Sequence, residues 1–163
     1  MKWYACYTKP RAEKKSLEKL QRAGITCYLP LKKERRKWSD RLKTVYTPLF
    51  TSYVFVYIAD HEFHKTRIEG DLAGFITFEG KAAPIPEAQI DIIKRIISTG
   101  EEIDVVPADI KAGQKIEIIE GPLIGVMAEL VRHQGNHKVL IRLDDLKQGV
   151  LFSIDKSYIA SRL

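Results

Sequence analysis

The sequence predicts an α+β fold in two parts, an N-terminal antiparallel sheet with packed helices followed by a small β-barrel. Strand-like and helix-like segments alternate through residues 1–100, whereas residues 110–163 contain strand-like segments alone. Between them, residues 101–109 are acidic and have no clear period. We therefore expect a first domain over residues 1–100, a linker over 101–109 and a second domain over 110–163.

The first strand and the first helix have clear boundaries. Residues 2–8, KWYACYT, are aromatic and β-rich, as expected of a strand. Helix-forming residues follow, with Pro10 near their start and Gly24 just past their end. Proline is pre-organised for a first helical turn and glycine tolerates the left-handed conformation after a last one, so a helix is expected between them. Residues 25–31, ITCYLPL, predict a second short strand.

The clearest strand signal lies in residues 46–58, YTPLFTSYVFVYI. Aromatic and β-branched side chains alternate there, and a strand places alternate residues on opposite faces. One face is therefore expected to be aromatic, with Tyr53, Phe55 and Tyr57, and the other β-branched, with Val54, Val56 and Ile58.

The rest of the first part predicts two more helices around a strand. Asp60 is a candidate N-cap for a helix over residues 61–70, and residues 73–80 read as a strand. Residues 87–98 predict a helix that presents Ile90, Ile93 and Ile97 on one face and ends before Gly100.

Turn residues divide the second part into short strands. The expected strands cover residues 114–121, 125–133, 137–146 and 149–159, and glycines stand between them. Four or five short strands within about 50 residues favour a small barrel, because closing the sheet removes its exposed edges.

The positive charge is concentrated in one short segment. Residues 31–43, LKKERRKWSDRLK, hold seven Lys or Arg and two acidic residues, or +5 of a formal total of +6. Residues 1–100 carry a net +8 and residues 101–163 a net −2. This asymmetry indicates a polyanionic partner near the first domain.

Other features exclude several classes of protein. The two cysteines, Cys6 and Cys27, lie in apolar segments and indicate buried free thiols rather than a disulfide scaffold. The N-terminus becomes polar too soon for a signal peptide, and no apolar run is long enough to span a membrane. We therefore expect a soluble cytoplasmic protein that does not contact a membrane.

Residues 112–131, AGQKIEIIEGPLIGVMAELV, contain a turn with a recognisable spacing. An alternating strand followed by Gly121, Pro122, two further residues and Gly125 resembles the KOW motif, which implies an SH3-like barrel here. Gly121 is expected to be extended because a proline follows it, and Gly125 allows a tight return into the next strand. The motif more usually has glycine at the position of Ala128.

Four segments of the first part extend this resemblance. WYACYTKPRAEKKSLEKL, PLFTSYVFVYI, LAGFITF and PIPEAQIDIIKRI occur in the order and at the spacing of the NusG N-terminal domain. The chain thus resembles a full-length NusG-family transcription elongation or antitermination factor. Its long basic insertion is similar to that of the specialised RfaH-like paralogues. It departs from the family in having Phe50-Thr51-Ser52-Tyr53 where Phe-Pro-Gly-Tyr is usual.

The resemblance implies that RNA polymerase is the partner and that the factor suppresses pausing or termination by bridging the DNA cleft. The expected contacts to the polymerase clamp are Trp3, Tyr4, Phe50, Tyr53 and Phe55. The expected contacts to the polymerase gate loop are His64, Lys65 and Thr66. The alternatives remain open that the rings fill the core and that the second set is a solvated helix face.

The basic segment is expected to contact upstream or non-template DNA. Arginine and lysine bind phosphates without reading sequence, and Trp38 can stack on an unpaired base. The expected nucleic-acid contacts are Lys9, Lys15, Lys19, Arg35, Arg36, Lys37, Trp38, Arg41 and Lys43. The alternative is a solvated charged loop.

The second domain is slightly acidic, and the resemblance implies that it recruits the ribosome or Rho. No cofactor, metal or enzymatic activity is expected, and the protein should act as a monomer. His61 and His64 lack further ligands in reach by sequence, and no spacing typical of a nucleophile and its base occurs. An alternative function is that of a KOW-containing RNA-binding or ribosome-associated protein that does not act on polymerase.

Overall fold

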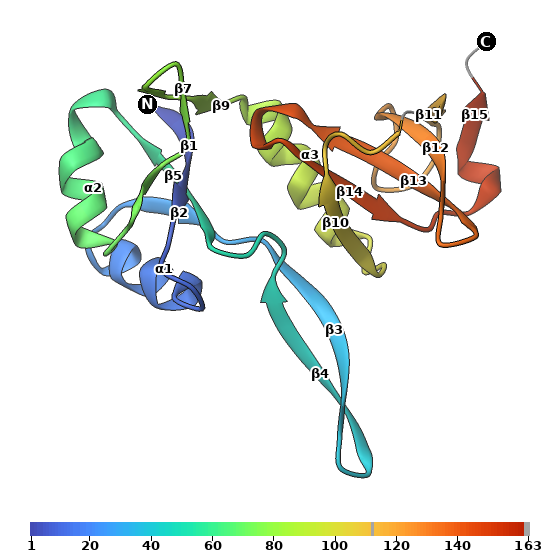
Figure 1. Cartoon of the computed structure of the whole chain (residues 1–163), viewed down its shortest axis with the longest axis horizontal. Helices are drawn as coiled ribbons and strands as arrows, with labels where there is room; N and C mark the ends of the chain where they lie inside the picture. The colour runs from blue at the N-terminus through green and yellow to red at the C-terminus, as the bar shows by residue number, and fades with distance from the viewer. Residues whose placement is uncertain (112, 162–163) are drawn as a thin grey trace. The chain divides into compact units, whose positions relative to one another are not determined.

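The computed structural model describes residues 1–111 and 113–161, which form two compact units (Figure 1). The first unit comprises Met1–Leu31 and Pro48–Ile90, and the second comprises Lys32–Thr47 and Asp91–Leu163. The first unit contains β1 (Lys2–Tyr7), α1 (Glu13–Arg22), β2 (Thr26–Tyr28), β5 (Tyr53–Ile58), η1 (Asp60–Glu62), α2 (Phe63–Glu69), β6 (Gly74–Phe75), β7 (Thr77–Phe78), β8 (Lys81–Ala82) and β9 (Pro84–Ile85).

The second unit holds two long strands and a β-rich domain. Its elements are β3 (Leu31–Trp38) and β4 (Arg41–Pro48), then β10 (Ile103–Pro107), β11 (Gln114–Ile118), β12 (Met127–His133), β13 (Asn136–Leu143), η2 (Asp144–Leu146), β14 (Gln148–Phe152), η3 (Lys156–Tyr158) and β15 (Ile159–Ser161). Helix α3 (Glu87–Ser98) crosses the division between the two units.

The first unit is built on an antiparallel sheet with the strand order β2-β5-β1-β6, and β9 also pairs with β1. Strands β1 and β5 pair over their whole length, with Ala5 opposite Phe55 and Cys6 opposite Val54. This confirms the predicted antiparallel sheet and its packed helices. The register decides which side chains share a face, because successive residues point to opposite sides.

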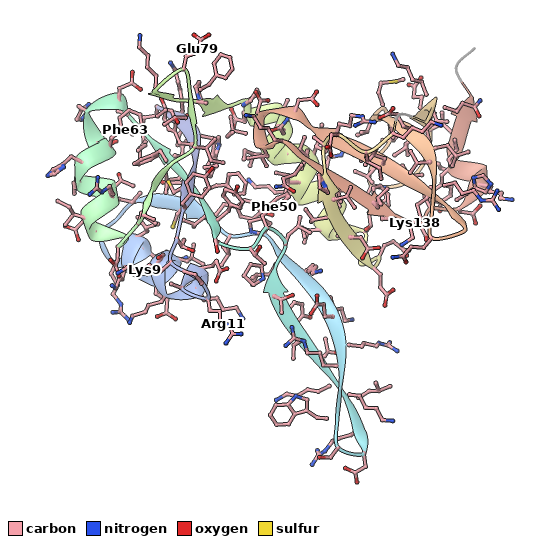
Figure 2. All side chains as sticks on the ribbon, in the orientation of Figure 1. Lys9, Arg11, Phe50, Phe63, Glu79 and Lys138 are labelled. Atoms are coloured by element: carbon pink, nitrogen blue, oxygen red, sulfur yellow. The ribbon has the colours of Figure 1, made fainter. Side chains whose placement is uncertain are left out.

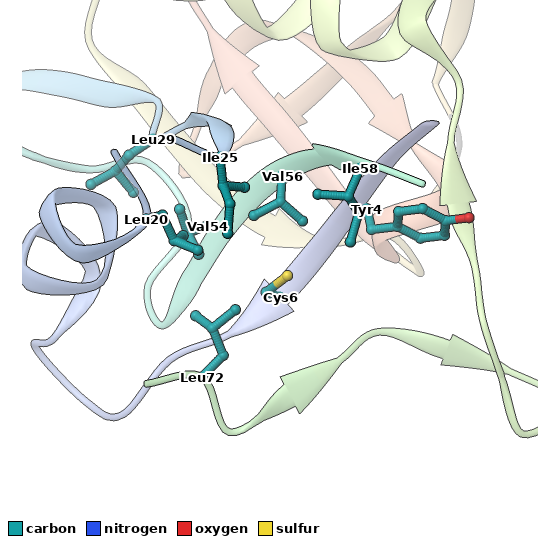
Figure 3. Packing of buried hydrophobic residues seen from close by; sticks show 9 residues of the cluster. All are labelled: Tyr4, Cys6, Leu20, Ile25, Leu29, Val54, Val56, Ile58 and Leu72. Atoms are coloured by element: carbon teal, nitrogen blue, oxygen red, sulfur yellow. The ribbon is translucent and has the colours of Figure 1, made fainter. Parts of the chain in front are cut away.

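The core of the first unit lies on the β-branched face of this sheet. Its buried cluster consists of Tyr4, Cys6, Leu20, Ile25, Leu29, Val54, Val56, Ile58 and Leu72 (Figure 3). Leu20 comes from α1, and Phe63 of α2 packs against the same cluster. Each large apolar side chain buried there contributes about 1.5–3 kcal/mol. The sheet is therefore held by helices on this face.

The helix boundaries agree with the sequence prediction at α1 and α3 but differ at α2. Gly24 has a φ of +73°, as expected of a residue just after a helix. Asp60 is not an N-cap, because a 3₁₀ turn precedes α2 and the Asp60 carboxylate accepts a hydrogen bond from the Tyr4 hydroxyl at 2.8 Å. The Glu62 carboxylate instead accepts a hydrogen bond from the Ala59 N–H at 2.7 Å.

Two further details of the first part differ from the prediction. Residues 73–80 do not form one strand, since β6 pairs with β1 whereas β7 pairs with β8, and Ile76 between them donates its N–H to the Ala5 carbonyl. On α3 the fully buried residues after Ile90 are Ile93 and Ile96, whereas Ile97 is half-buried. Ile96 and Ile97 both lie at helical spacing from Ile93, so tertiary packing decided which of the two is buried.

The basic segment forms a hairpin, β3 and β4, which we call the arm (residues 31–48) (Figure 1). Ser39 at its tight turn has a φ of +51°. At its base the Leu49 N–H donates to the Pro30 carbonyl at 2.8 Å, which ties the two ends of the arm together. Along the chain, the arm connects β2 to β5.

Residues 103–161 form a six-stranded antiparallel sheet with the order β10-β14-β13-β12-β11-β15, which we call the C-terminal β domain. The expected linker over 101–109 is wrong in part, because Ile103–Pro107 forms β10 and pairs with β14. Its apolar alternation is short and is hidden among acidic residues and a proline. Pairing with β14 supplies the partner that decides its conformation.

The KOW turn connects β11 and β12. Gly121 has a φ of +84° rather than the ordinary extended value, and Gly125 has a φ of +82°. Glycine lacks a Cβ, so the following proline does not force it into the conformation expected of other residues. Arg95 of α3 donates to the carbonyls of Pro122 and Ile124 at 2.7 and 2.6 Å, which fixes the outside of the turn.

We predict that Gly113→Ala destabilises the C-terminal β domain. An added Cβ would lie 2.1 Å from the Leu130 carbonyl oxygen, and backbone cannot yield as a flexible side chain does. The expected loss is about 1–3 kcal/mol in the free energy of unfolding, measured by urea denaturation. Gly74→Ala is the matched control, since its Cβ meets nothing within 4 Å. Equal stability of the two variants would contradict this packing.

Candidate functional site

The face of the sheet opposite the core cluster is aromatic. The β1–β5 register places Trp3 opposite Tyr57 and Tyr7 opposite Tyr53 on this face. Tyr28 of β2 lies opposite Phe55. Phe50, from the turn before β5, packs against the Phe55 ring. We call these seven residues the aromatic surface: Trp3, Tyr7, Tyr28, Phe50, Tyr53, Phe55 and Tyr57.

The rings of the aromatic surface are packed in pairs. The ring centroids of Trp3 and Tyr57 are 5.3 Å apart, those of Tyr7 and Tyr53 5.1 Å, and those of Phe50 and Phe55 6.2 Å. These distances lie in the range preferred by tilted and edge-to-face aromatic pairs, which favours a fixed arrangement over mobile side chains.

Exposure divides the aromatic surface into a base and a rim. Trp3, Phe50 and Phe55 are 8%, 3% and 0% exposed, so they form the base, and the sequence prediction of all three as direct contacts is corrected here. Tyr53 is half-buried and Tyr7 is 39% exposed, so they form the rim. Burial, together with a hydrogen bond to Tyr7, raises the pKa of Tyr53 to about 12. The Tyr53 phenol therefore stays protonated at physiological pH.

Tyr4 does not belong to this surface, which corrects the sequence prediction. It follows Trp3 directly and therefore points to the other face, where it is part of the core cluster. Burial, and then the hydrogen bond to Asp60, raises the pKa of Tyr4 to about 12. Tyr7 takes its place on the aromatic surface. The signal in the sequence was that Tyr7 follows Trp3 by four residues, an even number, which places both on one face of a strand.

A groove of about 330 Å³ borders the aromatic surface at the Trp3 end. It is lined by Met1, Lys2, Trp3, Tyr57, Pro84, Ile85, Pro86 and Glu87. Most of these side chains are apolar, and two carry charges of opposite sign. The aromatic surface is thus continuous with an apolar depression in the same unit.

The three residues expected to meet a gate loop do not share a face of α2. His64 and Lys65 are exposed, whereas Thr66 is fully buried and its hydroxyl has no hydrogen-bond partner within the described residues. Ile68 is 62% exposed and lies four residues after His64, so the two are neighbours on the helix. The exposed side of α2 includes His64, Lys65 and Ile68, which we call the exposed α2 face. In the sequence, Ile68 could have been recognised as an apolar residue four positions after His64, on the same side of the helix.

One side of the arm is partly neutralised near its base. Glu34 forms ion pairs with Lys32 at 2.9 Å and with Arg36 at 3.2 Å. The hydrogen bond from Lys32, with a further one from Arg36, lowers the pKa of the Glu34 carboxyl. Toward the tip, the Lys43 ammonium lies 5.5 Å from the centre of the Trp38 ring. This contact leaves Trp38 65% exposed.

Alternation along β3 places Lys33, Arg35 and Lys37 on the opposite side from Glu34, and all three are exposed. On β4, Leu42 and Tyr46 are also exposed although both are large and apolar. Neither residue was predicted from the sequence to contact nucleic acid. Exposed aromatic residues among cations are typical of surfaces that bind single-stranded nucleic acid.

The cations expected at α1 differ from those of the arm. Lys9, at the end of β1, and Lys19 both form ion pairs with Asp71, at 3.0 and 3.3 Å (Figure 2). Their hydrogen bonds lower the pKa of the Asp71 carboxyl. Lys15 is exposed. Lys9 and Lys19 are therefore already partnered, whereas the arm carries a large excess of positive charge.

Within residues 1–111 and 113–161, no three His, Cys, Asp or Glu side chains gather closely enough to hold a metal ion. Among the helices described there, none has the length and apolar character needed to cross a membrane.

Comparison with known proteins decides the family. Residues 1–94, more than half of the chain, match the family model described as transcription termination factor NusG. The chain belongs to the NusG family. A solved structure described as domain interaction in Thermotoga maritima NusG is similar to it, with a TM-score of 0.60 and 20% identity over 98% of this chain and 96% of that one. No curated protein matches the chain.

NusG-family membership accounts for the two parts of the fold, an N-terminal sheet with helices and a C-terminal β-rich domain. It also makes the chain a transcription elongation or termination factor in the general sense. Family membership does not identify which residues of this chain contact its partners.

We predict that Tyr4→Phe lowers stability below pH 10 by about 1 kcal/mol, the net contribution of a typical hydrogen bond. The folded-state pKa of Tyr4 is raised to about 12 from its ordinary 10.0, so its stabilising contribution is complete below pH 10 and is lost as the pH rises toward 12. The difference between the two proteins should therefore shrink over this range in urea denaturation. A constant difference would contradict the shift.

Proposed function

We propose that this NusG-family chain binds the clamp of RNA polymerase through its aromatic surface, bridges the DNA cleft and suppresses pausing or termination. The observation that carries the proposal is the exposed rim formed by Tyr7 and Tyr53 over a packed base. Aromatic anchors in well-packed pockets are enriched among residues that dominate binding energy. Trp3, Phe50 and Phe55 of this face are buried, so the rim is the part of the aromatic surface that a partner can reach.

The exposed faces of the sheet and of α2 decide which residues we propose as contacts to polymerase. Tyr7 and Tyr53 form the proposed clamp contact, with the buried Trp3, Phe50 and Phe55 as their support. The exposed α2 face, including Ile68 in place of Thr66, forms the proposed gate-loop contact. Two contacts that both fit only a closed clamp shift its population toward that state, and no chemical bond is made or broken. A difference of about 1.4 kcal/mol changes the ratio of closed to open clamp tenfold.

The arm forms the proposed DNA contact. Its exposed cations bind phosphates of upstream or non-template DNA, and Trp38 stacks on an unpaired base from the side that Lys43 does not cover. The length and charge of the arm also support a specialised, RfaH-like antitermination role within the family. The C-terminal β domain then serves to recruit a further partner such as the ribosome or Rho.

We predict that Tyr53→Ala weakens binding to RNA polymerase at least tenfold and abolishes the shortening of pauses during in vitro transcription. Loss of a buried aromatic anchor typically costs about 2 kcal/mol or more. Affinity is measured by pull-down titration with core polymerase free of nucleic acid. Tyr46→Ala, an exposed tyrosine of the arm, is the matched control and should bind as the unaltered chain does.

Two outcomes would count against the polymerase contact. Equal recovery of polymerase with both variants would favour the KOW-containing RNA-binding or ribosome-associated protein considered from the sequence. Failure of the unaltered chain to bind polymerase would do the same.

We predict that replacing Arg35, Arg36 and Lys37 by Gln makes single-stranded DNA binding less sensitive to salt. Each phosphate that the arm no longer neutralises should reduce the slope of log affinity against log salt by about 0.7, so three should reduce it by about 2. Fluorescence anisotropy with a labelled oligonucleotide measures the slope. Gln at Lys111, Lys115 and Lys156, exposed cations of the second unit, is the matched control. The same slope in both triple variants would rule out the arm as the DNA-binding segment.

A further inference from the structure

The turn that leads into β5 has an unusual conformation at Ser52. Its φ is +64°, in the left-handed region that glycine occupies freely and other residues rarely adopt. In the Phe-Pro-Gly-Tyr pattern that residues 50–53 resemble, glycine stands at this position, whereas this chain has serine. Some interaction must therefore hold a side-chain-bearing residue in a backbone conformation that it does not favour.

Both backbone groups of Ser52 are bound by other elements of the first unit. Its N–H donates to Oε1 of Glu13 at 2.7 Å, and its carbonyl accepts from the Thr8 N–H at 2.9 Å. Glu13 lies in the first turn of α1, 39 residues away along the chain, and Thr8 directly follows β1. The turn is thus fixed from two sides.

Glu13 is unusual among charged residues in being buried. It is only 6% exposed, and a buried carboxylate is costly unless hydrogen bonds compensate it. The first turn of a helix favours negative charge, and a charged acceptor makes a shorter and stronger hydrogen bond than a neutral one. These conditions keep the acceptor for the Ser52 N–H in place.

We propose that Glu13 is a positioning residue for the polymerase-binding aromatic surface. By holding Ser52 in the left-handed conformation, Glu13 sets the directions of the chain before and after the turn. Phe50 of the base stands two residues before Ser52, and Tyr53 of the rim follows it. Glu13 thus replaces the conformational freedom that a glycine would supply. The inference rests on the proposed polymerase contact.

If Glu13 had a purely structural role, the effect of losing it would respond differently to a change at position 52. If the carboxylate only anchors α1 to the sheet, its loss cannot be corrected at position 52. If it holds the Ser52 conformation, glycine at position 52 restores what the loss of Glu13 removes, because glycine adopts that conformation without support. The Ser52→Gly substitution therefore separates the two roles.

The experiment compares Glu13→Ala, Ser52→Gly and the double variant, all as full chains, for affinity to core polymerase and for thermal unfolding. Glu13→Ala should bind about tenfold more weakly, in keeping with loss of a hydrogen bond to a charged group. Ser52→Gly should bind as the unaltered chain does, and the double variant should recover most of the lost affinity. Glu13→Gln, which retains an acceptor oxygen for the Ser52 N–H, is the conservative variant and should keep most of the affinity that Glu13→Ala loses.

Amide hydrogen exchange gives a readout that does not need polymerase. The Ser52 N–H should exchange slowly in the unaltered chain and much faster in Glu13→Ala. The Ile76 N–H, which donates to the Ala5 carbonyl at 2.9 Å, is the internal control and should not change.

The outcomes distinguish this inference from the proposed function. Lost affinity that Ser52→Gly restores, with faster exchange at Ser52, supports the positioning role. Normal affinity of Glu13→Ala, with Tyr53→Ala still impaired, overturns it and leaves the polymerase contact standing. Lost affinity and lower thermal stability that Ser52→Gly does not restore make Glu13 a structural anchor and also overturn it. No binding by the unaltered chain removes the proposed function and this inference together.

Discussion

The antiparallel pairing of β1 with β5 is the constraint on which the first unit depends. Its register assigns every side chain of both strands to one of two faces, and a slip by one residue would exchange them. Val54 and Val56 thereby enter the core beneath α1 and α2, while Tyr53 and Phe55 reach the aromatic surface. The same six residue pairs thus determine both what holds the unit together and what it offers to a partner.

The aromatic surface depends in turn on what surrounds it. Phe50 and Phe55 are buried and support the rim, and the turn between them is fixed by Glu13. A polar contact from the core side of the sheet therefore bears on the exposed tyrosines. This arrangement is typical of binding sites in which packed neighbours orient the residues that touch the partner.

The positively charged side chains also fall into two groups, those held in ion pairs and those that are exposed. Lys9 and Lys19 share one carboxylate, and Glu34 holds two cations near the base of the arm. The exposed cations toward the tip of the arm accompany Trp38, whose ring one ammonium partly covers. Positive charge thus has local carboxylate partners in the first unit and at the base of the arm, and is exposed toward the tip of the arm.

The sequence by itself determined the two-part fold, the antiparallel sheet, α1, α3 and the aromatic alternation of β5, because these depend on local periods and helix-end residues. Tertiary structure alone decided that Tyr4 and Thr66 point inward, that Ile103–Pro107 pairs as a strand, and that Ser52 adopts a left-handed conformation. Each of these depends on a partner distant in the chain, such as β14 or Glu13. A local pattern carries no information about which distant segment will supply that partner.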